Sequence, residues 1–273
     1  MKKIAKIFAW ISGVLLLLVI GLMLYIRSVA RIDEPVVTEA TVEGEIKQID
    51  GEFWQLNNNW FRKSESGLYE LYVEGEPYER GVAIGKLSKN LIQYQEEVFN
   101  HQIHQLVPSE YYLNVLKYLV GWFNRSLDDH VAEEFRQEIY GVSRVASSEF
   151  DNIAPAYQRI LNYHAAHDIG HALQNMSLVG CTAFATWGSR SEDSTLIVGR
   201  NFDFYVGDDF AKNKIVAFYA PANGHRFMMI TFGGMTGVLS GMNEQGLTVT
   251  LNAAKSEIPS GSATPVSLVA REI

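Results

Sequence analysis

The sequence predicts an α+β fold, in which a mostly helical first half precedes a mostly β second half. Between residues 78 and 174, apolar residues recur at intervals of three and four, the period of an amphipathic helix. From Cys181 onward, short apolar runs alternate with glycine- and asparagine-rich breaks, which is typical of strands and turns. The pattern therefore changes at Cys181, the single cysteine of the chain.

Length and composition indicate an ordinary globular protein. The 273 residues suffice for one large domain or two small ones, and 47% of them are hydrophobic and 20% charged. The formal net charge is −8 and the sequence pI is about 5.4. A protein that binds nucleic acid needs clustered Lys and Arg to neutralise phosphates, and the sequence has no such basic stripe. We therefore expect no nucleic-acid partner.

The N-terminus predicts a membrane anchor. Residues 7–26 (IFAWISGVLLLLVIGLMLYI) carry no charge, and a helix of this length matches the hydrocarbon thickness of a bilayer, ~30 Å. Three lysines precede it and two arginines follow within five residues. The more positive flank should stay cytoplasmic, which places the rest of the chain outside the cytoplasm, in the periplasm or extracellular space. The alternative is a cleaved signal peptide ending near residues 28–30, but the apolar run exceeds the usual h-region and favours a retained anchor.

Four segments follow from these patterns. Residues 1–31 form the cytoplasmic tip and anchor, 32–51 a polar linker, 52–180 a mostly helical segment, and 181–273 a β-rich segment. We predict a strand over 68–73 and helices over 78–102, 109–123, 128–145 and 153–174, with Gly81 and Gly85 marking close packing at the start of the first helix. Strands are predicted over 182–187, 195–200, 214–220, 226–232 and 247–252. Residues 265–273 resemble the opening of a helix, so we expect the natural domain to continue past Ile273.

Three segments around the cysteine carry a resemblance to a known family. Gly180 and Cys181 precede a strand, GRNFDF occupies 199–204, and GMNEQGLTVTLN occupies 241–252. Together these segments resemble the cysteine N-terminal-nucleophile hydrolases, most closely the penicillin acyl-coenzyme A acyltransferase branch, with relatives among choloylglycine hydrolases and acid ceramidases. The resemblance is best over 180–252, weaker over 69–180, and excludes the anchor. It implies a four-layer αββα fold, with two antiparallel sheets between layers of helices.

The resemblance also implies a mechanism. The precursor would cleave itself between Gly180 and Cys181, and Gly180 suits this step because a residue without Cβ tolerates strained backbone. The freed α-amine of Cys181 titrates near ~7.7–8.0 and can act as general base without a histidine. The thiol would form a thioester with a small-molecule amide or acyl substrate and pass the acyl group to water or an amine. Hydrolysis is favoured over transfer, because water is abundant outside the cytoplasm; no cofactor or metal is implied.

The resemblance assigns roles to three further residues. Asp203 would hold the cysteine amine, Arg200 would favour the thiolate, and Asn252 would stabilise the oxyanion. Each also has a plainer interpretation: Arg200 and Asp203 as an ion pair at a strand end, and Asn252 as a turn cap. The sequence departs from the family pattern in two ways: a loop at 189–194 lengthens the spacing from the cysteine, and a further C-terminal Asn or Arg used by relatives is missing.

A histidine-rich helix offers a rival interpretation. His164, His167, Asp168 and His171 fall on one helix face at metal-binding spacing, although the Glu of an HExxH motif is absent. They would support a histidine- or metal-dependent hydrolase, or a papain-like pairing with Cys181; the plainer interpretation is a polar helix face. A third hypothesis is a non-catalytic, membrane-tethered binding module.

The remaining aromatic residues are interpreted as core rather than as part of a cofactor site, and some of them as lining an acyl pocket. They include Tyr111, Tyr112, Trp122, Phe123 and Phe204.

Overall fold

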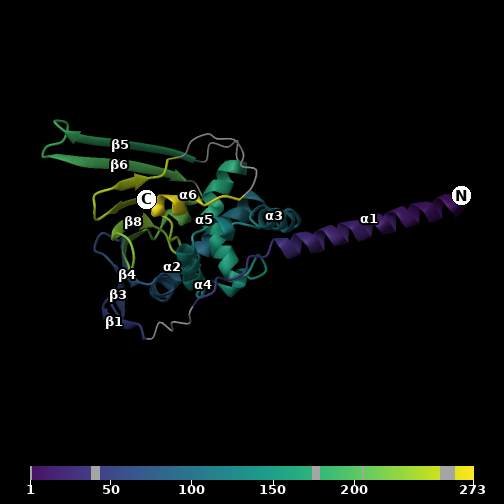
Figure 1. Ribbon diagram of the computed structural model, residues 1–273, viewed down its shortest axis with the longest axis horizontal. Helices are drawn as coiled ribbons and strands as arrows, with labels where there is room; N and C mark the ends of the chain where they lie inside the picture. Colours follow the sequence, from purple (N-terminus) through teal and green to yellow (C-terminus); the bar gives the residue numbers. More distant parts are fainter. Residues whose placement is uncertain (1, 38–43, 174–178, 205, 253–261) are drawn as a thin grey trace.

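The computed structural model describes residues 2–37, 44–173, 179–204, 206–252 and 262–273. Figure 1 shows a globular part from which one long helix, α1 (Lys2–Val29), projects. The globular part combines helices with a large sheet, which confirms the predicted α+β class. Within the described residues, α1 is the one helix that is long and apolar enough to cross a membrane.

One eight-stranded sheet combines residues from both sides of Cys181. All of its neighbouring strands are antiparallel except β4 and β7, which run parallel from the Tyr69–Ile215 pair to the Gly75–Pro221 pair. The two halves therefore share one sheet and one core. In spatial order the strands are β1 (Lys47–Asp50), β2 (Phe53–Leu56), β3 (Asn59–Lys63), β4 (Tyr69–Gly75), β7 (Ile215–Pro221), β8 (Phe227–Thr231), β9 (Ser240–Asn243) and β10 (Thr248–Thr250).

The helices pack together beside this sheet. The described helices after α1 are α2 (Pro77–Leu106), α3 (Glu110–Phe123), α4 (Glu133–Ser143), α5 (Ala156–Leu173) and α6 (Val266–Glu272). Helices α2 and α4 cross so closely that a Cβ placed on Gly81 would lie 2.1 Å from the Glu138 carbonyl oxygen. At Gly85 the same contact, to the Gly141 carbonyl oxygen, would be 3.3 Å. The close packing predicted from these two glycines is confirmed.

The predicted cysteine strand belongs to a separate hairpin. Strands β5 (Val179–Gly188) and β6 (Ser194–Phe204) pair only with each other among the described residues, and the lengthened loop at 189–193 is their turn. Figure 1 shows the hairpin extending along the sheet beyond the rest of the globular part. Its outer portion exposes Phe184, Trp187, Leu196 and Ile197. Among the described residues, this two-stranded hairpin is the only β structure outside the eight-stranded sheet. The predicted four-layer arrangement with two full sheets therefore stays a prediction.

The strands before residue 64 differ from what the apolar pattern indicated. Strand β1 lies inside the 32–51 range interpreted as a linker, and β2 and β3 lie in a range interpreted as mostly helical. Four or five residues are too few to display a clear period. The signal that was available is the Asn57-Asn58 turn: Asn57 has φ +53°, and asparagine is among the residues that tolerate this conformation. The predicted helix over 128–145 begins later, at Glu133, after a short 3-10 segment at Asp128–His130.

The base of α1 is attached to the globular part. Gln158 on α5 donates from Nε2 to the Ala30 carbonyl at 2.5 Å, and its Oε1 accepts from the Ile32 amide at 3.4 Å. Ile32 is itself buried in the core. The projecting helix therefore continues into the fold through bonds to α5.

Candidate active site around Cys181

The register of the β5–β6 hairpin places the predicted residues relative to one another. Cys181 pairs with Phe202, Gly180 with Asp203, and Ala183 with Arg200. Directly opposed residues of an antiparallel pair share a face, and alternate residues of a strand share that face too. Cys181 and Arg200 therefore lie on one face of the hairpin, and Asp203 lies at the register position of the Gly180 backbone.

Arg200 is the residue that links Cys181 to the main sheet. Its Nη2 donates a hydrogen bond to the Leu251 carbonyl, and its guanidinium carbon lies 4.3 Å from the centre of the Phe202 ring. Burial lowers the pKa of Arg200 below its usual value, while the side chains of Cys181 and Asp203 act in the opposite direction. The guanidinium and the Cys181 side chain thus interact on one face of the hairpin.

Asp203 and Asn252 occupy different environments from Arg200. Asp203 is exposed on β6. Asn252 is also exposed, and its Nδ2 donates to Thr250 Oγ1 at 3.2 Å. However, Asn252 directly follows Leu251, whose carbonyl binds Arg200. The structure thus places Arg200 on the same face as Cys181 and Asp203 on the opposite face, beside Gly180. Asn252 follows the residue whose carbonyl binds Arg200, and its amide is directed at Thr250.

An apolar cavity of ≈ 80 Å³ lies against the hairpin. Phe202, the partner of Cys181 across the ladder, is one of its lining residues. The other aromatic lining residues come from α2, α5, the 3-10 segment Asp208–Ala211 and the loop after β8; they are Phe99, Tyr163, Phe210 and Phe232. The Phe99–Tyr163 and Phe210–Phe232 ring centres are 5.1 Å and 5.2 Å apart.

This cavity was missed in the sequence, because its residues come from five separate segments and share no motif. The aromatics interpreted as core behave differently: Tyr111, Tyr112 and Trp122 are exposed, because α3 packs against the rest of the fold along only one side. For those three the core interpretation is wrong. The side chain of Phe204 lies outside the described side chains.

The histidine face is partly used by the fold. His164 is 1% exposed, and its Nε2 lies 3.0 Å from the Thr236 amide nitrogen, which can only donate. Nε2 is therefore the acceptor, Nδ1 carries the proton, and that proton is donated to the Ile160 carbonyl at 2.9 Å. Asp168 Oδ2 accepts from the Val266 amide at the start of α6.

These bonds occupy two of the four proposed metal ligands. The side chains of His167 and His171 lie outside the described ones. Across the residues that are described, no group of three or more His, Cys, Asp or Glu side chains is placed to hold a metal ion.

The burial of His164 predicts acid sensitivity of the fold. Burial lowers its pKa from 6.5 to about 4, so the unfolded chain binds a proton between these values that the folded chain does not. The contribution of His164 to the free energy of unfolding is therefore fully present above pH 6.5 and is lost as the pH drops toward 4. We expect unfolding free energy to fall by about 2 kcal/mol between pH 7 and pH 5 from this group.

Chemical denaturation of the detergent-solubilised chain across this range checks the expectation. His164→Gln should lose that part of the pH dependence, whereas the matched change at the exposed His101, His101→Gln, should keep it. An identical pH profile for all three chains would contradict the assignment.

A family of known proteins matches the part of the chain that contains three of the candidate site residues. The sequence model of the family described as acyl-coenzyme A:6-aminopenicillanic acid acyl-transferase matches residues 189–273. The match includes Arg200, Asp203 and Asn252 and begins eight residues after Cys181. An uncharacterized protein of Archaeoglobus fulgidus is 25% identical over 222 residues, which cover 76% of this chain and 37% of that protein. The chain thus spans well under half the length of this relative. The family match is confined to 85 of the 273 residues and lies after Cys181 in the chain.

Proposed function

We propose that this protein is a membrane-anchored amide hydrolase or acyltransferase that uses Cys181 as an N-terminal nucleophile after cleavage of the Gly180–Cys181 bond. The observation that carries the proposal is the shared face of Cys181 and Arg200 on the β5–β6 hairpin, with the Arg200 guanidinium interacting with the thiol. The family match to the stretch that contains Arg200 supports the same chemistry.

The chemistry passes through one covalent intermediate, and protons are transferred both when the thioester forms and when it is hydrolysed. The free amine of Cys181 takes the thiol proton, the sulfur attacks the substrate carbonyl carbon, and the carbon–nitrogen bond breaks as the leaving amine receives that proton. Water then attacks the thioester, the carboxylic acid leaves, and the thiol is restored. Arg200 stabilises the thiolate, Asp203 holds the amine, and Asn252 donates to the oxyanion once its amide turns away from Thr250.

The apolar cavity supports an apolar acyl group as the part of the substrate that is recognised. Its wall is mostly aromatic and aliphatic, with Gln95, Glu96 and His164 as polar members, and it reaches Phe202 opposite the nucleophile. Pockets of this kind bind ligands mainly by removing apolar surface from water. The proposed substrates are therefore linear or cyclic amides of apolar carboxylic acids.

Helix α1 is proposed to span the membrane once. The stretch Lys3–Val29 is strongly apolar, and its most apolar part has no buried residue. An apolar helix that no protein surface covers is stable in a bilayer and costly in water. The lysines at the start of the helix favour a cytoplasmic N-terminus, which puts the active site outside the cytoplasm.

Intact-mass spectrometry of the purified full chain tests the proposal without knowledge of the substrate. We expect a fragment that begins at Cys181, carrying a free cysteine N-terminus that an aldehyde probe converts to a thiazolidine. The Cys181→Ala chain should keep the full mass and react with no probe. If the wild-type chain also keeps its full mass under conditions where it is folded, self-processing is ruled out and the histidine-dependent alternative becomes the one to test.

A further inference from the structure

Helix α3 presents an apolar face that no described part of the protein covers. Of its 14 residues, Glu110 and Lys117 carry charge, and Gly121 is the one buried residue. The exposed large apolar residues recur every three or four positions along one side of the helix; they are Tyr111, Tyr112, Val115, Tyr118, Leu119 and Trp122. Such a face is unstable in water, which indicates that something other than water contacts it.

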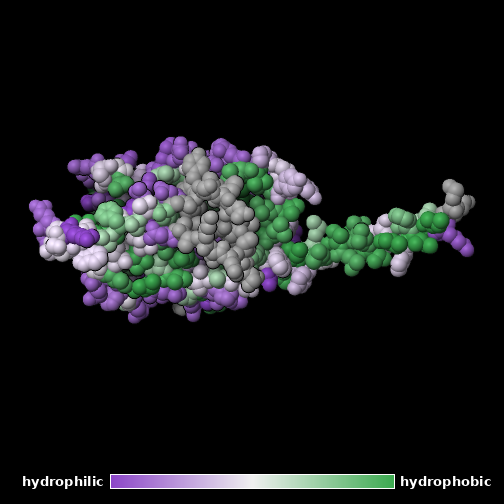
Figure 2. Space-filling model, turned by 90° about the horizontal axis from the view of Figure 1, so that it is seen from above, coloured by the Kyte–Doolittle hydropathy of each residue, from purple (hydrophilic) through white to green (hydrophobic). Residues whose placement is uncertain are grey.

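The position of α3 beside the membrane helix indicates what contacts this apolar face. A Cβ placed on Gly121 would lie 3.1 Å from the Cβ of Ala30, so the end of α3 packs on the residue that follows α1. Figure 1 shows α3 at the end of the globular part from which α1 emerges, and Figure 2 shows hydrophobic surface gathered at that end. If residues 7–26 fill the hydrocarbon layer, Ala30 lies ~6 Å beyond it at 1.5 Å per residue, within the headgroup layer. The end of α3 must then lie at the same depth.

The residue types of α3 fit that depth. Tyrosine and tryptophan favour the boundary between hydrocarbon and headgroups, where the ring is apolar and the polar group stays hydrated. Cationic groups stand against two of these rings: Lys117 Nζ lies 5.4 Å from the Tyr118 ring centre, and the Arg125 guanidinium 4.7 Å from that of Trp122. Such cations can reach lipid phosphates while the rings lie deeper.

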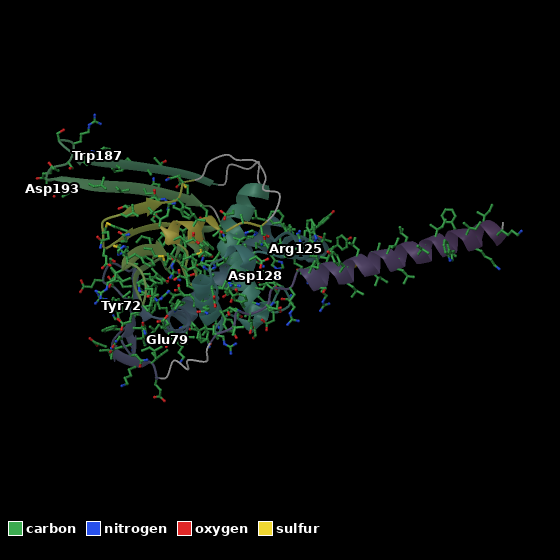
Figure 3. All side chains as sticks on the ribbon, viewed as in Figure 1. Tyr72, Glu79, Arg125, Asp128, Trp187 and Asp193 are labelled. Atoms are coloured by element: carbon green, nitrogen blue, oxygen red, sulfur yellow. The ribbon has the colours of Figure 1, made fainter. Side chains whose placement is uncertain are left out.

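We propose that α3 lies in the surface layer of the bilayer beside α1, as a second membrane contact of the globular part. The inference rests on the membrane-anchoring part of the proposed function. Two contacts, one spanning and one lying in the surface, fix the orientation of the globular part relative to the membrane. The hairpin tip then points away from the lipid: Figure 3 shows Trp187 at the opposite end of the globular part from α1.

Tryptophan quenching by brominated lipid tests this in the full chain. The chain has five tryptophans, at 10, 54, 60, 122 and 187. The protein is reconstituted into phosphatidylcholine vesicles, with or without dibrominated chains, in a Trp10→Phe background that removes the signal of the anchor. We expect brominated lipid to quench this chain, a further Trp122→Phe change to abolish the quenching, and the matched Trp187→Phe change to leave it intact.

A tryptophan moved along the same face guards against a folding artefact. In the Trp10→Phe/Trp122→Phe chain, Tyr118→Trp should restore quenching. The inference is overturned if quenching is equal with and without Trp122 and Tyr118→Trp does not restore it. It is also overturned if Trp122 is shielded from lipid because two copies of the chain pair through α3. The anchor is tested separately. The difference in quenching between the wild-type chain and the Trp10→Phe chain reports on Trp10. If Trp10 is quenched and Trp122 is not, the membrane anchor is supported and only the α3 contact is contradicted.

Discussion

Cys181→Ala should lower amide turnover by about 10⁶-fold, the scale of loss seen when a covalent nucleophile is removed. The loss is this large because the remaining groups position the substrate but cannot form the thioester. The change is small in structural terms: Cys181 is half-buried in a strand whose pairing depends on backbone atoms, so the hairpin should persist. The measurement is hydrolysis of p-nitroanilides of apolar carboxylic acids by the purified full chain.

Two comparison variants separate chemistry from folding. Ser189→Ala alters the exposed hairpin turn and should keep wild-type turnover. Cys181→Ser replaces the thiol with a hydroxyl, which is a much weaker nucleophile, and should retain a small fraction of activity at most. Turnover by the Cys181→Ala chain at the wild-type rate would contradict the proposed nucleophile, and its removal by a chelator would support the metal-dependent alternative.

The sequence predicted those parts of the fold that local pattern determines. The strand at β4, the long helix α2, its glycine-mediated crossing with α4, and the hairpin on both sides of the GRNFDF segment follow from periodicity and from residues with one dominant use. The association of Cys181 with Arg200 and Asp203 rests on the resemblance. In the antiparallel register Asp203 lies on the pair next to that of Cys181, and Arg200 lies two pairs away on the same face as Cys181.

What the sequence could not predict depends on contacts between distant segments. Phe99 and Phe232 line one cavity although 133 positions separate them, and no local pattern reports such a meeting. The spacing of His164 suggested a metal ligand, but its ring accepts a hydrogen bond from the backbone amide of Thr236, 72 positions later in the chain. Periodicity identified α3 as a helix, but burial of its aromatic face depends on what the neighbouring elements leave uncovered.

The largest loss of folding stability is expected from changing a buried cluster of charged side chains between α2, α4 and α6. The Glu138 carboxylate is fully buried and receives hydrogen bonds from Arg80 Nε at 2.9 Å and from Arg271 Nη1 and Nη2 at 2.6 and 2.7 Å. Burial alone would raise the pKa of Glu138, but the two guanidiniums outweigh it and hold the pKa below its usual value. Each guanidinium also donates to a carbonyl, Arg80 to Gly75 and Arg271 to Thr236.

Glu138→Gln should therefore reduce the free energy of unfolding by about 3–5 kcal/mol, because it leaves two buried cations without their counter-charge. The matched control is Glu70→Gln, which breaks the 2.6 Å pair with Arg62 at the protein surface and should cost less than about 1 kcal/mol. Chemical denaturation of the full chain in detergent measures both. Equal losses for the two variants would mean that water reaches Glu138 and screens the cluster. A large loss at Glu138 alone would establish that a single carboxylate joins α2, α4 and α6.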